Sequence, residues 1–102
     1  MIEKMSDITG KTFSTLAQKS KFTVEVVNEA GVVVRVHATR KNRTIGWNEI
    51  EKAWDYLRQN GTVTQTQILD MGTRSSAYIC VFLSNLPGVS YKLNPVRLIY
   101  QK

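Results

Sequence analysis

Residues 62–88, TVTQTQILDMGTRSSAYICVFLSNLPG, decide the fold of this chain. Thr64 and Gln67 have the spacing of a capping box, in which each side chain accepts a hydrogen bond from the other residue's backbone N–H. This pair predicts a short helix that begins after Thr64. Gly72 follows shortly and adopts a positive φ more readily than other residues, so a sharp turn is expected there.

A second helix is predicted to begin near Thr73 or Ser75 and to end at Pro87-Gly88, because proline cannot continue a helix. Its apolar residues have helical spacing and are expected to share one face: Ile79, Phe82, Leu83 and Leu86. Two short helices joined by so tight a turn favour a helix-turn-helix.

Length and composition are typical of one small globular domain. The chain has 102 residues, of which 42% are hydrophobic and 22% charged. Its apolar runs are shorter than the ~20 residues that span a bilayer, and the N-terminus does not resemble a signal peptide. The single cysteine, Cys80, stands in an apolar helix and is interpreted as a core residue. These features predict a cytoplasmic protein with no membrane partner.

The positive charge is unevenly distributed. The net charge is +6, yet residues 35–43 hold four basic residues and no acid, and residues 71–102 hold four more and no acid. The other segments are neutral or acidic. This asymmetry is typical of a surface that faces phosphate, although it is also compatible with a merely solvated basic face.

The N-terminal third contains the clearest β pattern. Phe13, Leu16 and Ala17 have helical spacing and predict a short helix. Residues 22–39 alternate between apolar and polar side chains on both sides of an Asn- and Gly-containing turn, which predicts an antiparallel hairpin with one apolar face. That face is expected to pack on the helices downstream, because an isolated hairpin is marginally stable.

Residues 46–60 are predicted to form the longest amphipathic helix, with Trp47 and Trp54 on its apolar stripe and Asn60-Gly61 as its end. Thr62-Val63 is expected to be a short strand. Residues 89–93 and 96–100 flank the turn-forming dipeptide Asn94-Pro95 and predict two strands, each with a buried face. Glu49 on the long helix is interpreted as a solvent-exposed acid.

The order helix, strand, helix, turn, helix, strand, turn, strand resembles the winged helix-turn-helix architecture over residues 46–102. The fold class expected is therefore α+β, with an N-terminal β-hairpin packed on a winged helix-turn-helix of three helices and a C-terminal β wing. Within a single domain spanning 1–102, residues 1–43 would supply the hairpin and a basic loop, and residues 44–102 the winged part.

The resemblance implies a surface that binds double-stranded DNA. In such domains the start of the second helix of the helix-turn-helix enters the major groove, and the wing contacts the backbone or minor groove. The DNA-binding residues expected on the helix, the wing and the basic loop are Arg74, Ser75, Ser76, Tyr78, Lys92, Arg97, Arg40, Lys41 and Arg43. Arg74 is the side chain among the helix candidates that can fork onto guanine.

One feature departs from this pattern. Residues 77–83 are almost entirely apolar, so the second helix offers a thin recognition face and is expected to be buried on more than one side. Either the N-terminal hairpin covers part of it, or it forms an interface with a protein partner or a second copy of the chain.

Catalytic chemistry and metal binding are not predicted. The single histidine, His37, excludes two-histidine metal motifs, and Cys80 with the distant His37 makes no recognisable dyad. We therefore expect a protein that is not an enzyme and needs no cofactor or metal. The sequence favours a regulatory duplex DNA-binding protein. The alternatives are a protein-interaction module, such as an adaptor or a phage or mobile-element inhibitor, and a non-catalytic domain of a larger nucleic-acid enzyme.

Overall fold

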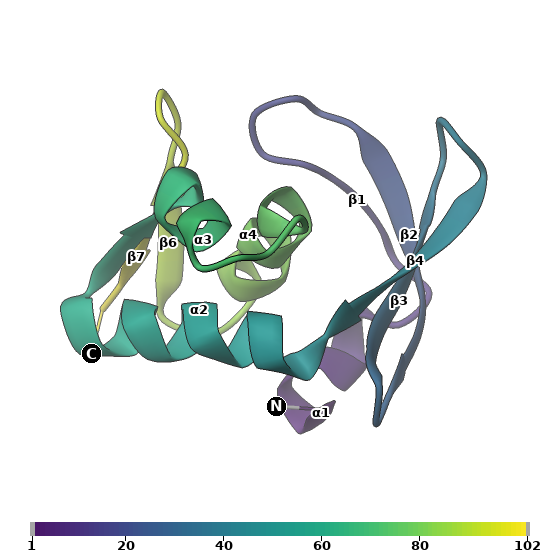
Figure 1. Cartoon of the computed structure of the whole chain (residues 1–102), viewed down its shortest axis with the longest axis horizontal. Helices are drawn as coiled ribbons and strands as arrows, with labels where there is room; N and C mark the ends of the chain where they lie inside the picture. Colours follow the sequence, from purple (N-terminus) through teal and green to yellow (C-terminus); the bar gives the residue numbers. More distant parts are fainter. Residues whose placement is uncertain (1, 102) are drawn as a thin grey trace.

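The chain forms a mixed α+β structure in which two antiparallel sheets stand on either side of a helical layer (Figure 1). The computed structural model describes residues 2–101. The N-terminal elements are α1 (Ile2–Met5), a 3₁₀ turn (Ser6–Ile8), β1 (Thr12–Ser14), β2 (Lys21–Asn28), β3 (Gly31–Val36) and β4 (Lys41–Gly46). The C-terminal elements are α2 (Trp47–Asn60), β5 (Thr62–Thr64), α3 (Gln65–Asp70), α4 (Ser76–Ser84), β6 (Val89–Lys92) and β7 (Arg97–Tyr100).

The predicted hairpin is present as β2 and β3, but it is the middle of a four-stranded sheet with the order β1-β2-β3-β4. The basic segment after the hairpin, predicted to be a loop, is a turn followed by β4. The boundary drawn after residue 43 therefore falls inside a strand. A run of basic residues does not prevent strand formation, because each side chain at a sheet edge can extend into solvent.

The helix predicted around Phe13 is wrong, because Thr12–Ser14 pairs with β2 as strand β1. The Phe13 ring lies 5.9 Å from the Phe22 ring on the neighbouring strand. Three apolar residues at helical spacing do not distinguish a single helical turn from a short edge strand followed by a loop. The cross-strand contact with Phe22 decides between them.

The alternation along β2 is interrupted by a register shift between Val24 and Val26. Phe22 and Val24 face the core, as predicted, whereas Val26 is exposed. An irregularity of this kind adds a residue to one strand and reverses which side chains face inward beyond it. The apolar face of β2 is therefore shorter than its sequence indicates.

The long helix α2 agrees with the prediction at both ends. It begins at Trp47, directly after Gly46, and ends where Gly61 takes a φ of 78° and donates its N–H to the Leu57 carbonyl. Its buried stripe consists of Ile50, Ala53, Trp54 and Leu57. This helix lies against both sheets and forms the base of the molecule in Figure 1.

The C-terminal sheet has the order β5-β7-β6, so the predicted short strand at Thr62 pairs with β7. Leu98 of β7 is fully buried. The expectation of a buried face on the preceding strand is wrong, because Tyr91 and Leu93 are 48% and 43% exposed. This hairpin extends beyond the helices, so no layer covers its far end (Figure 1).

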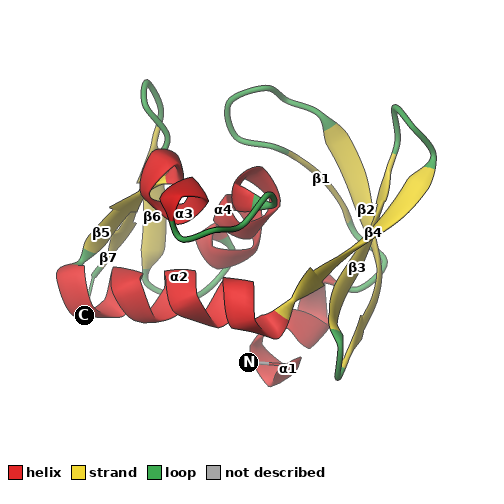
Figure 2. Cartoon of the chain, in the orientation of Figure 1, coloured by secondary structure: helices red, strands yellow, loops and turns green. Residues whose placement is uncertain are grey.

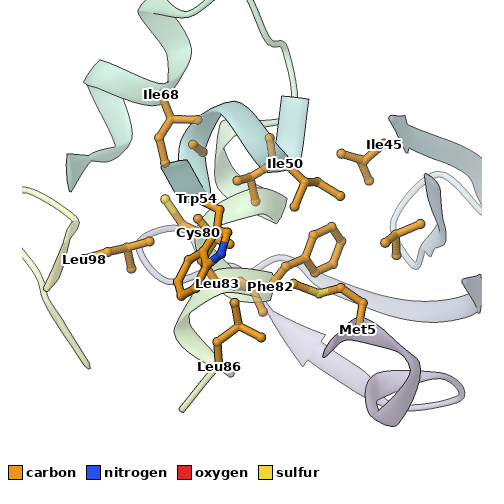
Figure 3. Packing of buried hydrophobic residues seen from close by; sticks show 14 of the residues in the cluster. Met5, Ile45, Ile50, Trp54, Ile68, Cys80, Phe82, Leu83, Leu86 and Leu98 are labelled. Atoms are coloured by element: carbon orange, nitrogen blue, oxygen red, sulfur yellow. The ribbon is translucent and has the colours of Figure 1, made fainter. Parts of the chain in front are cut away.

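Helix α4 lies at the centre of the molecule, and the core forms around it (Figure 3). The Phe22 ring of β2 packs edge-on against Tyr78 and Phe82 of α4, with centroids 5.0 and 6.1 Å apart. Residues from both halves of the chain, from Met5 to Leu98, belong to the same buried cluster. The four-stranded sheet therefore covers one side of α4, as the first of the two alternatives above requires.

Replacing Phe22 with alanine is expected to lower the free energy of unfolding by about 3–5 kcal/mol, because the ring is fully buried between three aromatic neighbours. Urea denaturation followed by circular dichroism measures the change. The matched control is Val26→Ala on the same strand, which is exposed and should change stability by no more than about 0.5 kcal/mol. Equal effects of the two substitutions would contradict the central position assigned to Phe22.

Candidate nucleic-acid interface

The predicted bihelical unit is present, and its local chemistry agrees with the sequence. The Thr64 hydroxyl accepts a hydrogen bond from the Gln67 N–H at 3.1 Å, and the Gln67 side chain accepts one from the Thr64 N–H at 2.9 Å. After α3, Gly72 takes a φ of 96°. Ser75 then precedes the first residue of α4, so the predicted starting point is confirmed.

Two of the predicted DNA-contacting residues face the interior. Ser75 is 4% exposed and Ser76 is 7% exposed. The backbone N–H of Ser75 donates to the Thr73 hydroxyl at 3.0 Å. Neither serine lies on a surface that a duplex can reach in this structure. Ser75 is the N-cap residue of α4, and Ser76 is its first residue.

A carboxylate that the sequence did not single out for a structural role holds this turn in place. One oxygen of Glu49 accepts a hydrogen bond from the buried Thr73 hydroxyl, and the other accepts from the Gly46 N–H at 3.3 Å. Glu49 thus links the end of β4, the first turn of α2 and the turn before α4. Its interpretation as a merely solvent-exposed acid is wrong. Its position in the first helical turn, where a glutamate can bond to the N-cap residue, was the available signal.

The Thr73→Val variant is expected to lose about 1–3 kcal/mol of stability, because it leaves the buried Ser75 N–H without its hydroxyl partner and removes the bond to Glu49. Thermal and urea unfolding measure the loss. Thr66→Val on the exposed face of α3 is the matched control, since valine and threonine have similar helix propensities. A loss no larger than that of the control would show that the turn does not depend on Thr73.

The structure brings Arg43, Arg74 and Tyr78 together. The Arg43 guanidinium donates to the Arg74 carbonyl oxygen at 2.9 Å and lies 5.5 Å from the centre of the Tyr78 ring. This cation–π contact connects β4 with α4. Arg43 and Tyr78 are half-buried and serve packing, whereas Arg74 is exposed.

Helix α4 lacks the solvent-facing surface that groove insertion needs. Within its described residues, six are buried and Ala77, Tyr78 and Ser84 are half-buried. A recognition helix presents several polar side chains to base edges in the major groove. Here that role is blocked by the four-stranded sheet on one side and by α2, α3 and the C-terminal sheet on the others.

The remaining predicted cations lie at the ends of hairpins. Lys92 and Arg97 are directly paired across β6 and β7, and both are exposed. The Arg97 guanidinium also donates to the Thr62 hydroxyl at 3.2 Å. Arg40 lies in the β3–β4 turn with a φ of 58°, and Lys41 begins β4. Lys92 and Arg97 therefore belong to the C-terminal sheet, whereas Lys41 and the Arg40 turn belong to the four-stranded sheet.

Three strand connections point to the same side of the molecule, at the top of Figure 2: residues 15–20, 37–40 and 93–96. We call this side the hairpin edge. Exposed basic residues within or beside these connections are Lys19, Lys21, Arg40, Lys41, Lys92 and Arg97. The β2–β3 turn, which carries the exposed Glu29, points to the opposite side, where α2 also lies. Helix α2 carries exposed side chains of both signs: Glu51, Asp55, Lys52 and Arg58. The hairpin edge is therefore rich in cations, whereas α2 carries charges of both signs.

The described residues contain no group of three His, Cys, Asp or Glu side chains that could hold a metal ion. Within residues 2–101, no helix has both the length and the apolar character needed to cross a membrane. Searches against protein-family models, curated proteins and solved structures find no match to this chain.

Cys80 is buried, and burial raises the pKa of its thiol to about 12. The reactive thiolate is therefore rare in the folded protein at neutral and mildly alkaline pH. We expect Cys80 to react with a disulfide reagent far more slowly than a free thiol, and to react fully once the chain is denatured. Absorbance of the released thiol measures both rates. Rapid labelling of the native protein would contradict the burial of this face of α4.

Proposed function

We propose that this chain is a non-catalytic protein that binds duplex DNA by contacting the phosphates of the DNA backbone. We also propose that it has the topology of a winged helix-turn-helix. The element order α2, β5, α3, α4, β6, β7 supports the topology, as does the strand order β5-β7-β6, in which the third strand lies between the other two. The lone, buried Cys80 is consistent with a cytoplasmic protein.

The observation that carries the proposal is the concentration of exposed cations along the hairpin edge. Lysine and arginine side chains that neutralise phosphates release counterions from the duplex, which supplies most of the affinity in non-specific binding. The chain thus acts by occupying DNA and limiting access to it, and phosphate contacts set its orientation on the duplex.

Sequence selectivity is expected to be low because α4 is enclosed. Four DNA-contacting residues were predicted at the start of the second helix. Of these, Arg74, which is exposed in the turn before α4, is the one whose side chain can approach a base. The longest dimension of the molecule is 34 Å, which is close to one helical turn of a duplex. One copy is therefore expected to cover about 10 base pairs.

The test is the affinity for a random duplex of about 20 base pairs, measured by fluorescence anisotropy from about 50 to 200 mM salt. The wild-type chain should show a steep log–log loss of affinity with salt. A Lys41→Ala, Lys92→Ala variant, which removes two cations from the hairpin edge, should bind more weakly with a slope that is shallower by about 0.9 for each lost contact.

The matched control is Lys52→Ala, Arg58→Ala, which removes the same charge from exposed positions on α2. It should retain both the affinity and the slope. Equal weakening by both variants would show that net charge, rather than the hairpin edge, determines binding. Absence of binding at low salt would overturn the DNA proposal.

A protein-interaction module is the second candidate, and exposed apolar side chains favour it. An open groove of about 280 Å³ is lined by Leu69 of α3, Ala17 of the β1–β2 connection, and Pro95 and Val96 of the β6–β7 turn. Leu69 is 51% exposed. Polar side chains also line this groove: Gln65, Thr66 and Ser76. Exposed apolar side chains beside a groove are found at protein contact sites. If the chain does not bind DNA at low salt, a protein-interaction module becomes the better supported function.

A further inference from the structure

A second cationic feature lies on the outer face of the four-stranded sheet, away from α4. An open hollow of about 460 Å³ is lined by Arg35, His37 and Arg40. All three side chains come from the end of β3 and the turn that follows it. They are exposed and are not buried beneath another element of the described chain.

Strand register explains why these side chains face outward. Arg35 is directly opposite Thr23 on β2 and Asn42 on β4, and opposite residues in a sheet project from the same face. The neighbouring Val34 is fully buried against the core. Because successive side chains alternate, Arg35 must project from the other face.

The backbone and the sheet hydroxyls hold this arrangement in place. The Arg40 N–H donates to the Val36 carbonyl at 2.8 Å, and Arg40 takes a positive φ of 58°, which is uncommon for a residue with a side chain. The His37 Nε2 is 2.8 Å from the Thr23 hydroxyl, which is itself 2.8 Å from the Thr12 hydroxyl. The imidazole is thus oriented through one nitrogen, and its Nδ1 is left for a ligand.

The charge balance of the hollow favours an anion. Glu25 is the one acid that contacts its lining in the described structure, with its carboxylate 3.3 Å from the Nε of Arg35. That contact engages one of the nitrogens of the guanidinium, so the terminal nitrogens remain able to donate. Two guanidinium groups then face a single carboxylate, which leaves a net positive charge.

We propose that this hollow binds a phosphate monoester, as found in a nucleotide or at a phosphorylated end of a nucleic acid. A phosphate monoester presents three terminal oxygens and up to two negative charges. Two guanidinium forks and one imidazole nitrogen match that acceptor set better than they match the two oxygens of a carboxylate. Arg40 belongs both to this hollow and to the hairpin edge, whereas Arg35 belongs to the hollow alone. Lys41 and Lys92, whose removal tests the duplex proposal, do not line the hollow.

The first experiment is a titration of the full chain with inorganic phosphate at constant ionic strength, followed by amide chemical shifts in ¹H–¹⁵N spectra. The shifts should saturate and should cluster at residues 35–41. Arg35→Gln and Arg40→Gln should each weaken phosphate binding about tenfold, the usual consequence of losing one hydrogen bond to a charged group. Unchanged shifts elsewhere in the spectrum show that these exposed substitutions leave the fold intact.

Lys52→Gln on α2 is the matched control and should leave phosphate affinity unchanged. Shifts that do not saturate, that acetate reproduces equally, or that persist with wild-type affinity in both arginine variants would overturn the proposal. Short duplexes with a 5′-phosphate or a 5′-hydroxyl then identify the source of the phosphate. Tighter binding of the phosphorylated duplex, lost in Arg35→Gln, assigns the site to nucleic-acid ends. Equal binding of the two duplexes, with saturable phosphate binding, assigns it to a small phosphorylated molecule.

Failure of this proposal is distinguishable from failure of the duplex proposal. The salt dependence of duplex binding is tested through Lys41 and Lys92, whereas phosphate binding is tested most specifically through Arg35, which lies outside the hairpin edge. Either result is obtained without the other.

Discussion

The contact of Phe22 with α4 is the constraint on which the rest of the structure depends. Its ring lies between Phe13 on the neighbouring strand and Tyr78 and Phe82 on the helix. Burial of these rings stabilises the attachment of the four-stranded sheet to the helical layer, because aromatic side chains bury large apolar areas. The same contact makes α4 a core helix. Helix α4 therefore holds the two halves of the chain together and is not free to bind a ligand.

This packing changes how the chain can bind DNA under our proposal. A helix with no exposed residue cannot supply a set of base contacts, so affinity must come from cations at the hairpin edge. Hairpin tips are suited to this task because they extend away from the core, and substitutions there need not disturb packing. Such binding is strongly dependent on salt and weakly dependent on sequence. Under this proposal, Ser75 and Ser76 do not contact DNA, because both are buried.

Local chemistry and the coarse packing of the hairpin on the helices could be predicted from the sequence, whereas individual tertiary contacts could not. The capping box of Thr64 and Gln67 and the turn at Gly72 depend on neighbours within a few residues, and both are present. Phe13 was misassigned because its partner, Phe22, is recognisable only once β1 is paired with β2. Glu49 was misassigned because Thr73 lies 24 residues away. Small polar residues such as Ser75 look equally suitable for a surface or for a satisfied interior position.

The basic run at residues 40–43 shows why a cluster of charges in sequence is not a surface in space. Lys41 and Arg43 are paired with Val36 and Val34, so they share the inner face of the sheet, and Arg43 reaches Tyr78. Arg40 precedes the strand and lies with Arg35 and His37 around the outer hollow. The turn before β4 and the register of β4 thus divide one basic run between the outer hollow, an exposed edge and a packing contact. Charge counting locates the segment, but strand register determines which of its cations act together.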